Sequence, residues 1–99
     1  VAGLEELVAR EREVCLVDVR EPEETASGHL AGVRLVPLRR LVEAAPDLPR
    51  DRPIVLVCRS GRRSTRGMHM LLDLGFADVY NLKGGILSWK AAGRSLVVE

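Results

Sequence analysis

Two short runs of apolar residues constrain the fold of this chain more than any other feature. Residues 14–17 read Val-Cys-Leu-Val and residues 53–57 read Pro-Ile-Val-Leu-Val, and neither run contains a charged side chain. A strand exposed on one face alternates apolar and polar residues, whereas an unbroken apolar run is typical of a strand buried on both faces. Such strands occur in parallel sheets that helices cover on both sides.

Helical patterns alternate with these strands along the chain. We predict helices or helical turns at residues 4–12, 22–24, 38–45, 64–74 and 85–92, and further short strands at 33–36 and 78–80. Pro46, Gly75 and Gly93 supply stop signals after three of the helices. The alternation predicts an α/β fold with a central, mostly parallel β-sheet flanked by helices on both faces, and the length suits a single domain over residues 1–99.

The composition excludes several classes of function. The net charge is +1 and aromatic residues make up 3% of the chain, so we expect no nucleic-acid partner. No apolar run approaches the roughly 20 residues of a membrane span. No signal peptide is visible, and two cysteines are too few for a disulfide scaffold, which together favour a cytoplasmic protein, although the chain begins without methionine. The histidines and cysteines show no metal-ligand spacing, so we expect neither a metal nor another cofactor.

Cys58 ends the second apolar run, at the carboxyl end of a predicted strand, which is where parallel sheets bind their ligands. Residues 59–63 read Arg-Ser-Gly-Arg-Arg, and we interpret Ser64 as the N-cap of the next helix. Gly61 permits a tight turn, which would direct backbone N–H groups into one concavity. These amides, the helix end and the arginines would lower the pKa of the thiol. The segment therefore predicts a nucleophilic thiolate that accepts anionic substrates.

The same residues also allow a structural interpretation. A cysteine at the end of a strand often packs as a small apolar side chain, and a cluster of arginines often forms a solvated face. Cys15, inside the first apolar run, fits the structural interpretation well. For Cys58 the strand end, the glycine, the arginines and the helix start coincide, and this coincidence favours the reactive thiol.

Three segments resemble the rhodanese family. "CRSGRRS" (58–64) resembles the active-site loop of that family, which is a cysteine, four residues, an arginine, and a serine or threonine. "LVDVREPEETASGHLAGVRLVPL" (16–38) and "GFADVYNLKGGILSWKAAG" (75–93) resemble two further segments of the family. The three lie in the family's order and cover most of the chain.

The resemblance implies one rhodanese domain that transfers sulfane sulfur. Cys58 would attack the outer sulfur of a donor such as thiosulfate, form a persulfide, and pass the sulfur to cyanide or a thiol. The rest of the loop would bind the substrate: Arg59, Ser60, Gly61, Arg62, Arg63 and Ser64. Arg63, which matches the family's closing arginine, would either brace the loop or bind the donor. Three matching residues would support the site structurally: Asp18, Arg20 and His29. The implied partners are a small anionic sulfur donor and a thiol or cyanide acceptor, and a sulfur-carrier protein is a further candidate.

Two other classes of function remain open. The first is an inactive or regulatory rhodanese-like docking module, although inactive members typically lose the cysteine, which this chain keeps. The second is a cysteine phosphatase or an arsenate reductase of related fold. A tyrosine-phosphatase loop places five residues between its cysteine and arginine, whereas four residues, 59–62, separate Cys58 from Arg63 here.

Overall fold

A computed structural model describes residues 14–82, 84–93 and 96, and at its centre is a four-stranded sheet. The strands are β1 (Cys15–Asp18), β2 (Arg34–Leu35), β3 (Ile54–Val57) and β4 (Val79–Asn81), arranged in the order β2-β1-β3-β4. Every pairing between neighbouring strands is parallel, as predicted. The carboxyl ends of all four strands therefore lie at one edge of the sheet. The predicted helix at 4–12 lies outside the described residues.

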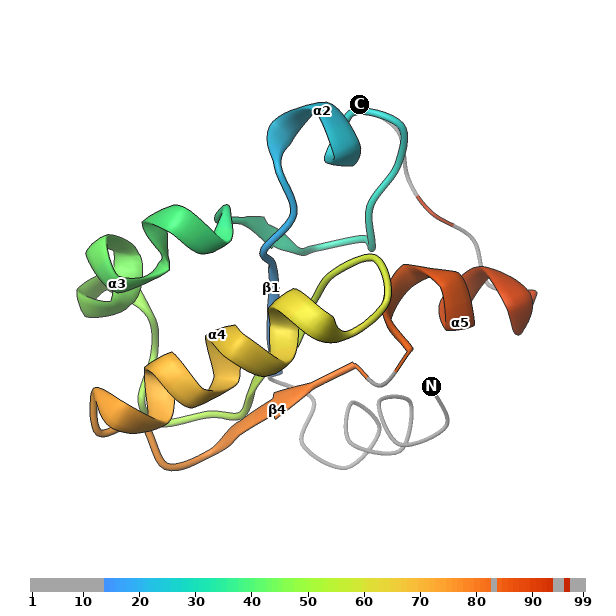
Figure 1. Ribbon diagram of the computed structural model, residues 1–99. Coiled ribbons are helices and arrows are strands. Elements are labelled where there is room, and N and C mark those ends of the chain that lie inside the picture. Colours follow the sequence, from blue (N-terminus) through green and yellow to red (C-terminus); the bar gives the residue numbers. More distant parts are fainter. Residues whose placement is uncertain (1–13, 83, 94–95, 97–99) are drawn as a thin grey trace.

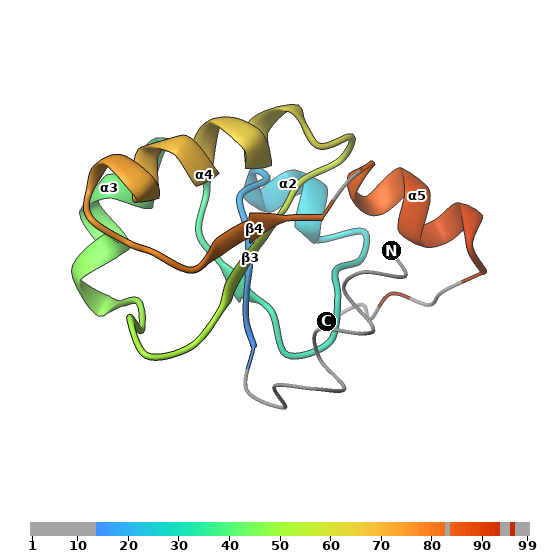
Figure 2. The same cartoon turned by 90° about the horizontal axis from the view of Figure 1, so that it is seen from below.

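The helices follow the strands in alternation. They are α2 (Pro22–Thr25), α3 (Leu41–Ala44), α4 (Arg62–Asp73) and α5 (Gly85–Ala91), with 3₁₀ turns at Leu38–Arg40 and Ala45–Asp47. Figure 1 shows α3 and α4 side by side, with α5 beyond the loop that precedes α4. The view from below in Figure 2 again places α3 and α4 together, with α5 apart from them. None of the helices in the described ranges is long and apolar enough to cross a bilayer.

The central strand β3 is buried on both faces, which is the arrangement that its unbroken apolar sequence predicts. Ile54 and Leu56 point into one apolar cluster, which α3 and α4 close with side chains such as Leu41 and Leu71. Val55 and Val57 point into a second cluster on the opposite face, together with Leu30, Leu82 and Ile86. Ile86 belongs to α5. Helices thus cover both faces of the sheet.

Two predicted helices differ by more than one residue at a boundary from those in the structure. The segment 38–45 is not one helix, because α3 occupies only Leu41–Ala44 between the two 3₁₀ turns. Pro46 lies inside the second turn, where its missing N–H and its ring prevent an α-helix from continuing. Helix α4 begins at Arg62 rather than at Ser64, because Gly61, at φ 105°, is its N-cap. The prediction that Ser64 caps this helix is therefore wrong.

Candidate active site

Cys58 lies at the carboxyl end of β3, beneath the loop that leads into α4. Its side chain is buried, with 1% of the residue exposed. The backbone N–H groups of Gly61 and Ser64 donate hydrogen bonds to Cys58 Sγ at 3.0 and 3.4 Å. The thiol in turn lies 3.6 Å from Ser64 Oγ, to which it donates. The loop therefore wraps around the sulfur and turns its amides towards it.

Helix α5 holds the outer side of this loop. The N–H groups of Ile86 and Leu87 donate to the carbonyl oxygens of Cys58 and Arg59, at 2.9 and 3.0 Å. A Cβ atom on Gly85 would overlap both carbonyl groups, so glycine is required for this close approach. Because C=O and N–H point in opposite directions across a trans peptide, fixing the Arg59 carbonyl on α5 turns the N–H of Ser60 away from that helix.

The carbonyl of Gly61 anchors the other end of the loop. It accepts hydrogen bonds from the backbone N–H of Thr65 at 3.1 Å, from Thr65 Oγ1 at 2.7 Å and from Ser64 Oγ at 3.1 Å. Asn81 Nδ2, at the end of β4, donates to Thr65 Oγ1 at 2.7 Å. Two elements thus fix the position of Gly61, the residue whose N–H donates to the sulfur.

The two cysteines differ in acidity. Burial acts to raise the pKa of the Cys58 thiol, but hydrogen bonds from Ser64, Gly61 and Ser60 outweigh it and leave the pKa lowered. Burial raises the pKa of Cys15, and the positive charges of Arg34 and Arg52 do not offset it. Donors to sulfur stabilise the charged form, which is the nucleophilic form of a thiol. Of the two, Cys58 has the environment of a reactive cysteine.

Arg63 braces the loop through an ion pair. Its two terminal nitrogens contact the two carboxylate oxygens of Glu24 at 2.6 and 2.7 Å. Hydrogen bonding from Arg63 lowers the pKa of Glu24 to about 2 and, in return, raises the pKa of Arg63. The pair connects the start of α4 to α2, so the guanidinium is occupied by a carboxylate rather than free for a ligand.

Asp18 and Arg20 form a buried pair beside α2. Arg20 Nε and Nη2 both donate to the Asp18 carboxylate, and the two residues are 6% and 0% exposed. Arg20 Nη2 also donates to the carbonyl oxygen of Gly28 at 2.7 Å. His29 is buried next to this segment, with Nδ1 3.0 Å from the carbonyl oxygen of Leu30. The side-chain hydrogen bonds of Arg20 thus hold the chain around α2.

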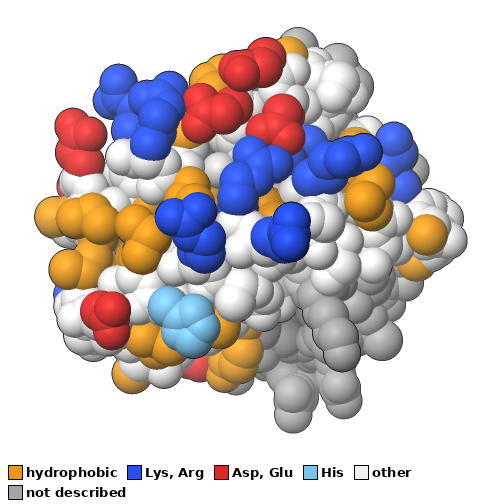
Figure 3. Space-filling view, viewed as in Figure 1, with side chains coloured by type: hydrophobic (Ala, Val, Ile, Leu, Met, Phe, Trp, Pro, Cys, Tyr) orange, Lys and Arg blue, Asp and Glu red, His pale blue; other side chains and the backbone are white. Residues whose placement is uncertain are grey.

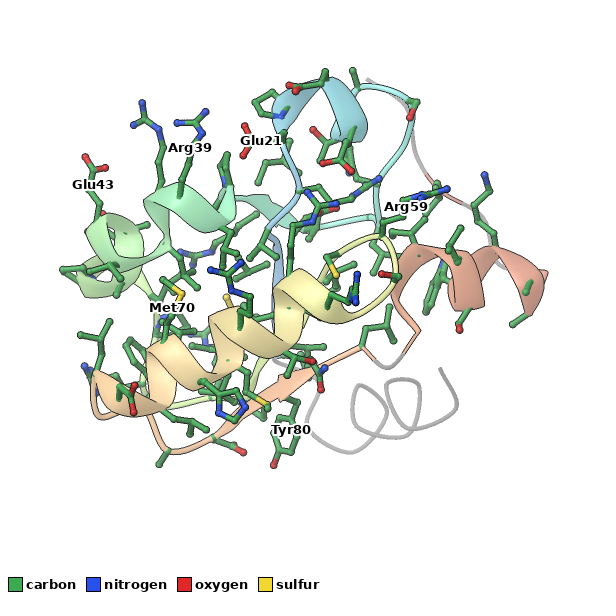
Figure 4. All side chains as sticks on the ribbon, in the orientation of Figure 1. Glu21, Arg39, Glu43, Arg59, Met70 and Tyr80 are labelled. Carbon is green, nitrogen blue, oxygen red and sulfur yellow. The ribbon has the colours of Figure 1, made fainter. Side chains whose placement is uncertain are left out.

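The remaining arginines of the loop, Arg59 and Arg62, are exposed. Arg59 extends from the loop on the side of α5 (Figure 4). Arg62 borders an open groove of about 530 Å³, whose other walls come from α4 and the end of β4. Within the part of the chain that the structure describes, no group of three or more His, Cys, Asp or Glu side chains is arranged to hold a metal ion.

Sequence reasoning missed two contacts of this site. The partner of Arg63, Glu24, is 39 positions away, and no local pattern connects the two. The packing of α5 on the loop was missed too, although Gly84-Gly85 before a helix is a signal for close backbone approach.

Known proteins resemble this chain in both sequence and fold. The sequence profile described as Rhodanese-like domain matches residues 1–92. The chain belongs to the rhodanese-like family. A rhodanese-related protein from Thermoplasma volcanium superimposes with a TM-score of 0.88 and 33% identity, over 99% of this chain and 94% of the other.

Two relatives within the rhodanese-like family have names that state an activity. The Sulfurtransferase of Allochromatium vinosum is 35% identical over 96% of this chain and 89% of its own length. The Thiosulfate sulfurtransferase GlpE of Pseudomonas paraeruginosa is 38% identical over 83% of this chain and 74% of its own length. The family and the parallel α/β fold expected from the sequence are thus confirmed.

Proposed function

We propose that this protein is a thiosulfate sulfurtransferase that carries sulfane sulfur on Cys58. The observation that carries the proposal is the set of hydrogen-bond donors around Cys58 Sγ, which the loop supplies from Gly61, Ser64 and Ser60. Such donors stabilise a thiolate, which is the form in which Cys58 attacks the sulfur donor and the form in which it leaves when the persulfide is consumed. The names of the relatives from Allochromatium vinosum and Pseudomonas paraeruginosa support the same reaction.

In the first half of the reaction, the Cys58 thiolate attacks the outer sulfur of thiosulfate. A new S–S bond forms, the original S–S bond of thiosulfate breaks, and sulfite leaves with the electron pair of that bond. Once the thiol has lost its proton, the Ser64 hydroxyl, 3.6 Å from Sγ, is free to donate to the sulfur. The exposed Arg59 and Arg62 attract the dianionic donor to the loop.

In the second half, a thiophilic acceptor attacks the outer sulfur of the Cys58 persulfide. With cyanide the products are thiocyanate and the Cys58 thiolate, and with a thiol the product is a new persulfide. No proton transfer to the leaving group is needed, because the leaving Cys58 thiolate is already stabilised by the loop amides. A cytoplasmic location would suit this cycle, because a reducing compartment keeps Cys58 free of disulfides.

The state of Glu24 disfavours the phosphatase alternative. Hydrolysis of a phosphate ester through a cysteine calls for a general acid that protonates the leaving alcohol. Glu24 is the carboxylate bound to the arginine of the loop, and a pKa of about 2 keeps it ionised. The loop itself contains no acidic residue. Sulfur transfer needs no such acid.

A comparison of two substrates tests the proposed function. One preparation of the protein is assayed for thiocyanate formation from thiosulfate and cyanide, and for hydrolysis of p-nitrophenyl phosphate. We expect thiocyanate formation that disappears in Cys58→Ala, and no hydrolysis of the ester above the background of that variant. Cys58-dependent hydrolysis faster than sulfur transfer would refute the proposal, and absence of both activities would favour a docking module.

A further inference from the structure

Four basic side chains surround the loop over Cys58, and we call them the basic rim: Arg59, Arg62, Arg66 and Lys90. All four are exposed. Among the described residues, no carboxylate forms an ion pair with any of them, whereas Arg63 and Arg39 are each paired with a glutamate. Figure 3 shows Lys and Arg side chains in a band across the face that carries α4 and the loop.

The basic rim borders two separate hollows, one on each side of the loop. Arg62 and Arg66, one helical turn apart on α4, line the groove of about 530 Å³ together with Ser60. Arg59 and Lys90 line a second hollow of about 260 Å³ between α2 and α5. Glu24 also lines the second hollow, but its charge is neutralised by Arg63. A ligand that contacts both pairs of cations therefore has to extend across the loop.

Arg59 and Arg62 attract the donor in the first half of the reaction, which leaves Arg66 and Lys90 of the basic rim without a role in that step. Cys58 itself is only 1% exposed, so its sulfur cannot extend into a pocket on the acceptor. The acceptor must instead bring its thiol to the loop. An extended acidic segment satisfies both conditions, because its thiol reaches the loop while its carboxylates pair with cations on either side. Net charge is only +1, so this attraction is local to the rim.

We propose that the basic rim binds the sulfur acceptor, and that this acceptor is an acidic protein segment presenting a cysteine thiol. The inference rests on the proposed function and names the partner of that site. The thiolate of the acceptor attacks the outer sulfur of the Cys58 persulfide, a new S–S bond forms on the acceptor, and the bond to Cys58 Sγ breaks. The Cys58 thiolate leaves, and no external oxidant or reductant takes part.

The test uses the full chain, loaded first with thiosulfate and freed of excess donor. Intact mass establishes that one sulfur atom has been gained before any acceptor is added. Three probe peptides then receive the sulfur: one cysteine flanked by glutamates, the same peptide with serines in place of the glutamates, and the same with lysines. We expect the acidic peptide to react fastest, after correction for the thiolate fraction of each. Raising the salt from about 0.1 M to about 1 M, which shortens the Debye length from about 10 to about 3 Å, should remove its advantage.

Variants at the far ends of the basic rim locate the effect. Arg66→Gln and Lys90→Gln should each lower the rate with the acidic peptide by about twofold to fivefold, the range of exposed ion pairs, and should leave the rate with the serine peptide much less affected. In the double variant the two reductions in rate should multiply. Arg66→Lys, which keeps the positive charge, should react with the acidic peptide at the rate of the unmodified protein. Arg40→Gln, which removes an exposed arginine outside the basic rim, is the matched control and should not change the preference.

Several results would overturn the proposal. Equal rates for the three peptides with the unmodified protein would show that charge does not select the acceptor. An effect of Arg66→Gln without an effect of Lys90→Gln would indicate a small anion bound in one groove instead of a segment across the loop. If the protein gains no sulfur from thiosulfate, the proposed function fails at the loading step, and the acceptor proposal falls with it. This outcome is seen before any peptide is added, so it is distinct from a failure of the acceptor proposal alone.

Discussion

At the scale of single residues, the chemistry of the site depends on the hydrogen bonds that the loop donates to one sulfur atom, Cys58 Sγ. Two backbone N–H groups within 3.4 Å of Cys58 Sγ lower the pKa of a thiol that burial alone would make less acidic. Among the described residues no donor contacts the thiol of Cys15, and burial raises its pKa. The two cysteines are both buried, so the difference between them lies in hydrogen bonding rather than in exposure.

The pH dependence of alkylation tests this difference. In Cys15→Ser, which leaves Cys58 as the only thiol, the rate of reaction with iodoacetamide should rise with pH around a midpoint below the value of about 8.5 for a free cysteine. The physical reason is that the thiolate, which reacts, is stabilised by the loop amides. A midpoint at or above that value would mean that burial dominates at Cys58.

The ion pair between Glu24 and Arg63 predicts a pH dependence of stability. The pKa of Glu24 falls from 4.5 to about 2 on folding, so the folded state favours the charged form. This contribution is fully present above pH 4.5 and is lost as the pH falls through about 2. Urea unfolding should therefore find Glu24→Gln less stable than the unmodified protein at neutral pH, with the difference shrinking between these two values.

Glu23→Gln is the matched control for that experiment, because Glu23 is an exposed neighbour in the same helix. It should leave the unfolding free energy nearly unchanged across the same pH range. A loss at Glu24→Gln that does not depend on pH would argue that packing of the side chain, rather than its charge, stabilises the contact between α2 and α4.

At the scale of elements, two helices define the shape of the loop. The N–H groups of Ile86 and Leu87 in α5 hold the carbonyls of Cys58 and Arg59, while Thr65 in α4 holds the carbonyl of Gly61, the N-cap of that helix. The hydrogen bond from Asn81 to Thr65 extends this support to β4. The loop is therefore fixed from both ends, which leaves its amides preorganised around the sulfur.

The contact of α5 with the loop predicts an unusual cost for one alanine substitution. Gly85→Ala would place a Cβ against the carbonyls of Cys58 and Arg59, so it should force the helix and the loop apart. Besides about 1–2 kcal/mol for a left-handed backbone, such overpacking should cost about 1–3 kcal/mol more. We expect urea unfolding to show this loss, together with reduced sulfur transfer and a higher pKa of Cys58.

Gly93→Ala provides the matched control. Gly93 also has a positive φ, 79°, but apart from its chain neighbours no atom of the described residues lies within 4 Å of the position that its Cβ would take. Gly93→Ala should therefore lower the free energy of unfolding only by the cost of a left-handed backbone, and it should leave the pKa of Cys58 unchanged. Equal effects of the two substitutions would mean that the contact between α5 and the loop contributes nothing beyond backbone strain.

At the scale of the whole molecule, the sequence predicts best what short-range patterns encode. The unbroken apolar runs placed β1 and β3 correctly and implied cover on both faces, and the position of Cys58 at a strand end followed from them. The start of α4 was misplaced because Ser64 has the chemistry of an N-cap, whereas the chain turns earlier at Gly61. Arg63 was expected to brace the loop or bind the donor, and nothing local could indicate Glu24 as its partner.

The central claim is that sulfur is carried on Cys58, and intact mass spectrometry of the whole chain tests it most directly. The protein, Cys58→Ala and Cys15→Ser are each measured after incubation with thiosulfate and again after cyanide. We predict that the unmodified protein and Cys15→Ser gain the mass of one sulfur atom and lose it to cyanide, whereas Cys58→Ala gains nothing. If Cys58→Ala still gains the sulfur while Cys15→Ser does not, the claim is contradicted.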